Sequence, residues 1–116
     1  MSPEFIVSAQ RLGIELSALQ LQQLDLYRRH LQTVNQVMNL TALTSDEDIE
    51  QKHFYDALLI TRYVGSANTI LDVGSGAGFP GMVLAIVFPD KKVTLLEPIG
   101  KRCRFLNEVA VLLNLE

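Results

Sequence analysis

The sequence contains a single cysteine, no tryptophan and no long apolar run. Cys103 alone can form neither an internal disulfide nor a metal site made of cysteines, and a chain without such crosslinks is typical of the reducing cytoplasm. The N-terminus, MSPEFIVSAQ, lacks the basic start and long apolar stretch of a secretion signal. No segment reaches the roughly 18 apolar residues of a membrane span. We therefore expect a cytoplasmic protein that does not cross a membrane.

The sequence also lacks an excess of positive charge. The 10 lysines and arginines are outnumbered by 13 aspartates and glutamates, so the net charge of -3 does not by itself indicate nucleic-acid binding. Three short basic groups are candidates for contact with RNA phosphates, although such groups are often solvated surface. They are Arg28-Arg29, Lys91-Lys92, and Lys101-Arg102 with Arg104.

Residues 1–66 have the apolar spacing of helices and no convincing strand. Steps of three and four predict three helices, and a Ser17–Gln20 capping box begins the second. The helices cover about residues 4–12, 18–38 and 46–63. Their apolar positions include Leu24, Tyr27, Leu31, Val34 and Met38 in the second helix and Ile49, Ala57 and Ile60 in the third. We interpret His53, on the same side of the third helix, as a hydrogen-bonded packing residue and not as a catalytic base.

Residues 67–116 instead alternate strands with helices. The segment 69–73 (TILDV) is short and apolar, which predicts a buried strand, and 92–97 (KVTLLE) predicts a second one. Pro80 suits the first turn of a helix between the strands, and Phe88-Pro89-Asp90 ends that helix. A last helix is predicted over 101–113, with Phe105, Val109, Leu112 and Leu113 on its apolar side. This order indicates an α/β fold with a parallel, Rossmann-like sheet behind an N-terminal helical extension.

Glycines stand at alternate positions directly after the first predicted strand. Gly74, Gly76 and Gly78 allow the backbone to approach a ligand that any Cβ would keep away, and the following helix N-terminus offers unpaired N–H groups. Glu97 ends the second strand, where a carboxylate can accept the two hydroxyls of a ribose. Together these features predict a ligand that contains a nucleoside.

Two cofactor classes fit such a loop. The fingerprint of dinucleotide-binding folds, G-x-G-x-x-G, begins at the end of the first strand. Counted from Gly74, its sixth position is Phe79 and not glycine, so the fingerprint fails there. The segment 76–81 (GAGFPG) matches it but begins two residues late. An acid at Asp72 followed by alternate glycines is the first motif of class I S-adenosylmethionine methyltransferases, which we rank first. We interpret Asp72 as an acceptor for loop N–H groups. A nicotinamide-dependent oxidoreductase domain and a non-catalytic interaction module remain the alternatives.

Five segments carry a narrower resemblance. They are 39–42 (NLTA), 52–58 (KHFYDAL), 71–81 (LDVGSGAGFPG), 94–97 (TLLE) and 101–106 (KRCRFL). In their order and spacing the chain resembles the glucose-inhibited division protein B family, bacterial methyltransferases that modify N7 of a guanine in 16S ribosomal RNA. The resemblance implies the class I methyltransferase fold, S-adenosyl-L-methionine as the cofactor, and 16S ribosomal RNA or the small ribosomal subunit as the partner.

The resemblance also assigns roles to residues of the loop. It implies that Gly74 and Phe79 line the cofactor pocket, that Gly76 and Gly78 shape the loop, and that Glu97 holds the ribose. Members of the family more often have Asp at the position of Glu97, and Glu keeps the charge while adding reach. No catalytic side chain is implied, because guanine N7 already carries a free lone pair, and no metal is implied either.

The family continues through several further strands, whereas this sequence stops at 114–116, where the third strand would begin. We therefore expect residues 67–116 to be the first half of the cofactor-binding core, truncated after its second strand. The residues that read the guanine would lie beyond Glu116, and the chain alone would be inactive. We also expect an exposed edge on the first strand, which leaves the chain marginally stable or is buried by self-association.

Overall fold

The computed structural model describes residues 1–98 and 100–113. Its helices and strands are α1 (Pro3–Arg11), α2 (Ala18–Met38), α3 (Asp46–Asp48), the π-helix η1 (Ile49–Phe54), α4 (Tyr55–Leu59), α5 (Thr61–Val64), β1 (Thr69–Val73), α6 (Gly81–Val87), β2 (Lys92–Leu96) and α7 (Gly100–Leu112). None of these described helices is both long enough and apolar enough to cross a lipid bilayer.

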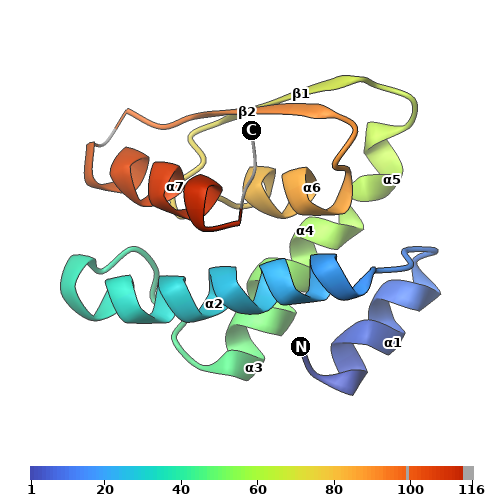
Figure 1. Ribbon diagram of the computed structural model, residues 1–116, viewed down its shortest axis with the longest axis horizontal. Helices are drawn as coiled ribbons and strands as arrows, with labels where there is room; N and C mark the ends of the chain where they lie inside the picture. Colours follow the sequence, from blue (N-terminus) through green and yellow to red (C-terminus); the bar gives the residue numbers. More distant parts are fainter. Residues whose placement is uncertain (99, 114–116) are drawn as a thin grey trace.

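The elements form layers (Figure 1). Strands β1 and β2 pair in parallel, with Thr69 opposite Lys92 and Val73 opposite Leu96, as the sequence predicts. Helix α6 connects the two strands and packs against both, and α2 lies across α6 and α7 on the side away from the sheet. Helix α4 contacts α6 and α1. The helical extension is therefore the base on which the βαβ unit rests.

The predicted capping box of α2 is confirmed, and it also joins α2 to α6. The Ser17 hydroxyl accepts the Gln20 N–H at 3.1 Å, and the Gln20 side-chain oxygen accepts the Ser17 N–H at 2.8 Å. The Gln20 amide group then donates to the carbonyls of Ile86 and Val87, which end α6. At the other end of α2, Asn39 adopts φ 50° and closes the helix. One glutamine thus provides hydrogen-bond partners for backbone groups at the start of α2 and at the end of α6, which have no partner within their own helices.

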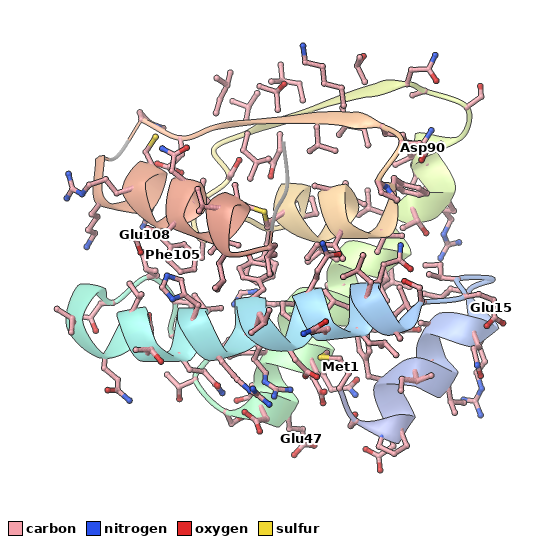
Figure 2. The ribbon with its side chains drawn as sticks, viewed as in Figure 1. Met1, Glu15, Glu47, Asp90, Phe105 and Glu108 are labelled. Carbon is pink, nitrogen blue, oxygen red and sulfur yellow. The ribbon has the colours of Figure 1, made fainter. Side chains whose placement is uncertain are left out.

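A histidine of α2 joins this helix to two residues of α7, Phe105 and Glu108, which are labelled in Figure 2. The His30 ring lies parallel to the Phe105 ring at a centroid distance of 5.5 Å, and its Nε2 is 3.0 Å from a carboxylate oxygen of Glu108. Phe105 is buried, as the periodicity of 101–113 predicts, but Leu112 from the same predicted face is 45% exposed. In the second predicted helix Leu24, Tyr27 and Leu31 are buried and Val34 partly so; the Met38 side chain lies outside the described residues.

The helix predicted over 46–63 is present, but it is not a regular α-helix. The segment begins as expected, with the Ser45 hydroxyl accepting the Asp48 N–H at 3.1 Å, but six residues of π-helix follow before α-helical geometry returns. A π-turn changes which residues share a face, so spacing rules for an α-helix fail beyond it. Helical geometry is interrupted again after α4, where Ile60, expected in the core, is 39% exposed.

The prediction of a buried first strand is wrong for one face of the sheet. Leu71 and Val73 are 60% and 72% exposed, and Leu96 on the neighbouring strand is 50% exposed. A parallel sheet is buried only when helices cover both faces, and α6 and α7 lie on the same face of this one. Among the described residues the outer edges of both strands lack a strand partner. Self-association through such an edge stays a prediction.

Arg28 is not a free phosphate contact, contrary to what its sequence neighbourhood suggests. Its guanidinium lies 3.4 Å from Asp25, 3.5 Å from Asp46 and 3.6 Å from Glu50, and its side chain is only 12% exposed. Glu50 is itself buried and accepts the Ser2 N–H at 2.8 Å. A buried carboxylate needs such a partner. The arginine therefore neutralises the charge of carboxylates from α2, α3 and the π-helix.

Tyr27 is the centre of the core. It is fully buried, its ring stacks on Phe54 at 5.5 Å and on Phe79 at 5.4 Å, and its hydroxyl donates to the Ala77 carbonyl at 2.5 Å. Burial, with a further contribution from the charge of Asp72, raises the pKa of Tyr27 well above its usual value, so the hydroxyl keeps its proton. The helical extension and the glycine loop meet at this ring.

Replacing Tyr27 with Phe keeps the ring and removes the hydroxyl. The Ala77 carbonyl then loses its buried donor, which we expect to lower the free energy of unfolding by about 1–3 kcal/mol. Urea unfolding followed by circular dichroism measures the change. Tyr63→Phe is the matched control, since Tyr63 is 79% exposed. Equal unfolding midpoints for the two variants would contradict the role given to the hydroxyl.

Candidate cofactor site at the glycine loop

The loop after β1 folds over the carboxyl ends of both strands. The N–H groups of Gly74 and Ser75 donate to the Leu96 carbonyl at 2.8 and 3.2 Å, and those of Gly78 and Phe79 donate to the Ser75 carbonyl at 2.9 and 3.1 Å. In open α/β sheets ligands bind outside the carboxyl ends of the strands. The loop therefore occupies the place where this class of fold binds its ligands.

Two glycines of the loop need their lack of a side chain for different reasons. Gly78 adopts φ +104°, and a Cβ there would lie 2.5 Å from the Tyr27 hydroxyl, so this position packs directly on the core. Gly76 adopts φ +59°, and a Cβ there would meet no atom within 4 Å. Gly74 is equally open on its Cβ side. One side of the loop is thus packed on the protein, and the other leaves backbone accessible to a ligand.

Asp72 and Gly81 fix the start of α6 against the sheet. A carboxylate oxygen of Asp72 accepts the Gly81 N–H at 2.9 Å, which agrees with the interpretation of Asp72 as an anchor for backbone N–H groups. A Cβ at Gly81 would lie 2.7 Å from that oxygen and 2.9 Å from a carbon of Leu95. Sequence reasoning assigned no role to Gly81, although glycine is a poor helix former and its presence at a helix start signals close packing.

Glu97 lies at the end of β2, as predicted, and contacts the loop itself. Its Oε1 accepts the Gly76 N–H at 2.7 Å. The side chain of an aspartate is one methylene shorter, so its carboxylate would reach less far toward the Gly76 N–H than that of Glu97. The carboxylate and the open face of Gly76 are therefore adjacent. The role of Glu97 in holding a ribose stays a prediction.

Phe79 turns toward the helical extension. Its ring is parallel to that of His53 within 4° at a centroid distance of 4.2 Å, and it also stacks on Tyr27. The Nε2 of His53 is 2.8 Å from the hydroxyl oxygen of Thr41, in the loop between α2 and α3. This agrees with the interpretation of His53 as a hydrogen-bonded packing residue. Its partner Thr41 was not identified from the sequence, because residues 12 positions apart have no local signature.

The predicted site residues separate into two groups in space. Gly74, Gly76 and Glu97 surround the open side of the loop, whereas Gly78 and Phe79 face the helical extension. Sequence reasoning treated Tyr27 only as an apolar core position. Its signal was the residue type itself, because a buried tyrosine normally finds a hydrogen-bond partner.

Comparison with known proteins identifies the family. The family model described as GidB, rRNA small subunit methyltransferase G, matches residues 20–116. The chain belongs to the GidB family. This confirms the resemblance noted in the sequence and, with the parallel βαβ unit, the class I methyltransferase fold. It gives no support to a nicotinamide-dependent oxidoreductase.

Curated relatives of this GidB family chain share the name ribosomal RNA small subunit methyltransferase G. The protein from Levilactobacillus brevis is 44% identical over 120 residues, which cover 99% of this chain and 50% of the relative. That from Lachnoclostridium phytofermentans is 47% identical over 107 residues (90% and 44%), and that from Bacillus pumilus 42% over 115 residues (97% and 48%). The chain spans about half the length of these relatives.

The ionisation of His53 offers a test of the geometry on the extension side. Burial lowers the pKa of His53 from 6.5, and the charge of Asp56 opposes this shift. Lys52 precedes His53 on the same segment, and the hydroxyl of Thr41 and the ring of Phe79 contact its ring. Because the folded protein binds this proton less readily than the unfolded chain, His53 reduces stability as the pH falls below 6.5 toward its lowered pKa.

Asp56→Asn should lower the pKa of His53 further, since it removes the charge that favours the imidazolium. A titration of the His53 Hε1 resonance by NMR measures both values. The matched control is Glu47→Gln, which removes an exposed carboxylate from α3 (Figure 2). A pKa above 6.5 in the unmodified chain, or no change in Asp56→Asn, would contradict the arrangement.

Proposed function

We propose that this chain forms the cofactor-binding half of a methyltransferase that transfers a methyl group from S-adenosyl-L-methionine to N7 of a guanine in 16S ribosomal RNA. One observation carries the proposal: the open backbone of the glycine loop and the Glu97 carboxylate lie together at the carboxyl ends of adjacent parallel strands. The names of the relatives support the choice of ribosomal RNA as substrate.

The residues present suit the cofactor. Gly74 and Gly76 would let backbone approach it, and Glu97 would accept the ribose hydroxyls. Gly78 and Phe79 would act indirectly, by holding the loop against Tyr27. A sulfate- or phosphate-type pocket is not required, because S-adenosylmethionine carries a carboxylate and an adenosine but no pyrophosphate. The side of the loop without a Cβ clash is the side where the ligand would lie.

Positioning is the main task of this site. S-adenosylmethionine supplies a methyl group on a sulfonium, which is already an activated leaving group, and guanine N7 has a free lone pair. The protein then needs no general base, and holding two reactants in a near-attack geometry is worth about 7–11 kcal/mol in favourable cases. A loop fixed by the Leu96 carbonyl, Glu97 and Tyr27 meets this requirement for rigidity.

The remaining parts of the proposal concern the partner. It would be 16S ribosomal RNA or the small ribosomal subunit, in the cytoplasm where ribosomes work. Arg28 would take no part, because its charge is used within the fold. Lys101, Arg102 and Arg104 at the start of α7 are better placed for phosphate contact, with Lys101 and Arg104 on the surface.

Isothermal titration of the chain with S-adenosylmethionine, S-adenosylhomocysteine and NAD tests the proposal. We expect saturable binding of the first two ligands, weakened at least tenfold by Gly76→Val because a side chain would occupy the open face of the loop. Gly65→Val is the matched control: Gly65 has φ +57°, close to the +59° of Gly76, and equally open space at its Cβ position. Binding of NAD alone, or S-adenosylhomocysteine binding unaffected by Gly76→Val, would contradict the proposal.

A further inference from the structure

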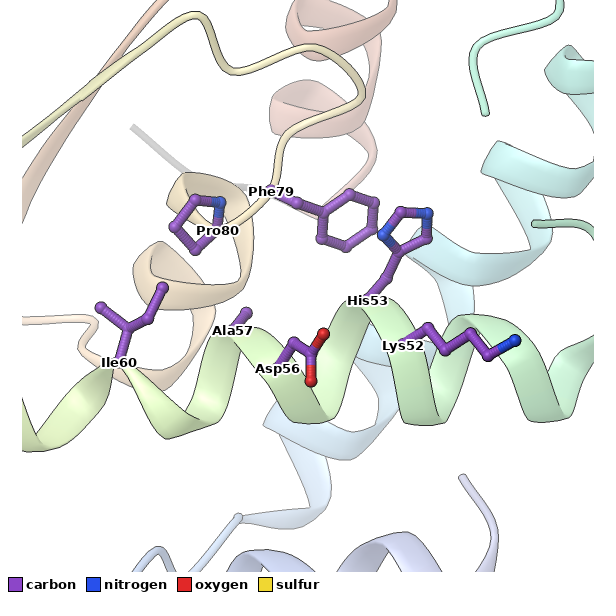
Figure 3. A pocket seen from close by; sticks show the side chains of 7 residues that line it. All are labelled: Lys52, His53, Asp56, Ala57, Ile60, Phe79 and Pro80. Atoms are coloured by element: carbon purple, nitrogen blue, oxygen red, sulfur yellow. The ribbon is translucent and has the colours of Figure 1, made fainter. Parts of the chain in front are cut away.

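A small pocket lies between the helical extension and the end of the glycine loop (Figure 3). Its volume is about 150 Å³, and it is open to solvent on one side. Phe79 and Pro80 contribute one wall, and the segment 52–60 contributes the other lining residues, Lys52, His53, Asp56, Ala57 and Ile60. Because Phe79 follows Gly78 directly, any molecule in this pocket lies next to the loop assigned to the cofactor.

The irregular part of the third helical segment faces this pocket. His53 is the fifth of the six π-helical residues, and the next residue, Phe54, is fully buried against Tyr27. Isolated π-turns inside helices are costly and occur frequently at functional sites. Here the π-turn places one ring against the core and the adjacent imidazole against Phe79, beside the opening.

The wall made by His53 and Phe79 is held in place from two sides. The imidazole is stacked on Phe79 at 4.2 Å, and its Nε2 is bonded to the Thr41 hydroxyl. The Thr41 oxygen also accepts the Leu43 N–H at 3.2 Å, so its own position is fixed. Since burial lowers the pKa of His53, the imidazole is neutral near pH 7 and does not repel a cationic reactant.

The size and chemistry of the pocket select a flat heterocycle. A cavity of about 150 Å³ has room for one benzene ring, so a base would insert one ring and leave the rest in the opening. Rings and apolar side chains form most of the lining, and Asp56 adds a carboxylate that only accepts hydrogen bonds. Guanine presents two adjacent N–H donors, N1–H and the N2 amino group, and a carboxylate pairs with both.

We propose that this pocket receives the guanine that is to be methylated, with Asp56 pairing with its N1–H and N2 amino group and with Phe79 and Pro80 forming the wall beside it. The inference rests on the proposed function and adds the acceptor site to it. Enzymes that modify bases read a base turned out of its stack in this way, through its Watson–Crick edge and through aromatic contacts. It also differs from the sequence-based expectation that all guanine-reading residues lie beyond Glu116.

The pocket suits the product as well as the substrate. In the transfer, the N7 lone pair forms the new bond to the methyl carbon, the carbon–sulfur bond breaks, and its electron pair stays on sulfur as a thioether. No proton leaves N7, so the purine becomes a cation. The Asp56 carboxylate favours a cation, and the ammonium of Lys52, the other charged residue of the lining, lies 3.6 Å from the carboxylate of Asp48.

NMR titrations of this chain with GMP, IMP and AMP test the pocket. We expect GMP to shift the Hε1 signal of His53 and the ring protons of Phe79, with affinity falling from GMP to IMP, which lacks the N2 amino group, and again to AMP. The other histidine, His30, is the internal reference, because it stacks on Phe105 away from the pocket.

Asp56→Asn should weaken the binding of GMP roughly tenfold, as expected when a hydrogen bond to a charged group is lost. It should also remove the preference of the pocket for GMP over AMP. Glu47→Gln makes the same change of charge on an exposed residue, and it should leave the affinity for GMP and the preference over AMP unchanged. Equal shifts from GMP and AMP in the unmodified chain, or a preference that survives Asp56→Asn, would overturn the inference. A parallel titration with S-adenosylhomocysteine keeps the two proposals apart: if it binds while GMP leaves the His53 and Phe79 signals unchanged, the pocket fails and the cofactor site stands.

Discussion

The structure depends on the contact between Tyr27 and the loop that follows β1. The Tyr27 hydroxyl holds the Ala77 carbonyl, its ring stacks on Phe79 and Phe54, and Gly78 packs so closely on it that no side chain fits there. A ligand loop made of glycines would otherwise lose much of its order, since glycine has the largest conformational freedom. The helical extension therefore holds the glycine loop in place and is part of the same packed unit.

Much of the architecture follows from local sequence chemistry. The Ser17–Gln20 capping box, the apolar spacing of α2 and the strand–glycine–helix order of 69–87 predict the observed elements, because each depends on residues near one another in the chain. What could not be predicted depends on distant partners. The π-helix before Tyr55, the bond between Glu97 and Gly76, and the exposed faces of Leu71 and Val73 are decided by packing across the fold.

Phe79 links the two sites proposed for this chain. On the loop side it follows the glycines that would contact the cofactor, and on the other side it stacks on His53 and lines the small pocket. A methyl donor and its acceptor must meet within a few ångströms, and two proposed sites that adjoin the same short loop satisfy this geometric condition. The family resemblance indicated the chemistry, and the place proposed for the acceptor rests on the pocket, the stacked rings and Asp56.

We conclude that the extension and the glycine loop form one cooperative unit. Native-state hydrogen exchange tests it directly, because the amides of Gly78, Phe79 and Met82 donate within the loop and at the start of α6. We expect these amides to open with the same free energy as those at the centre of α2, around Tyr27. Rapid exchange in the loop beside a protected α2 would show that the loop moves independently, and would contradict the claim.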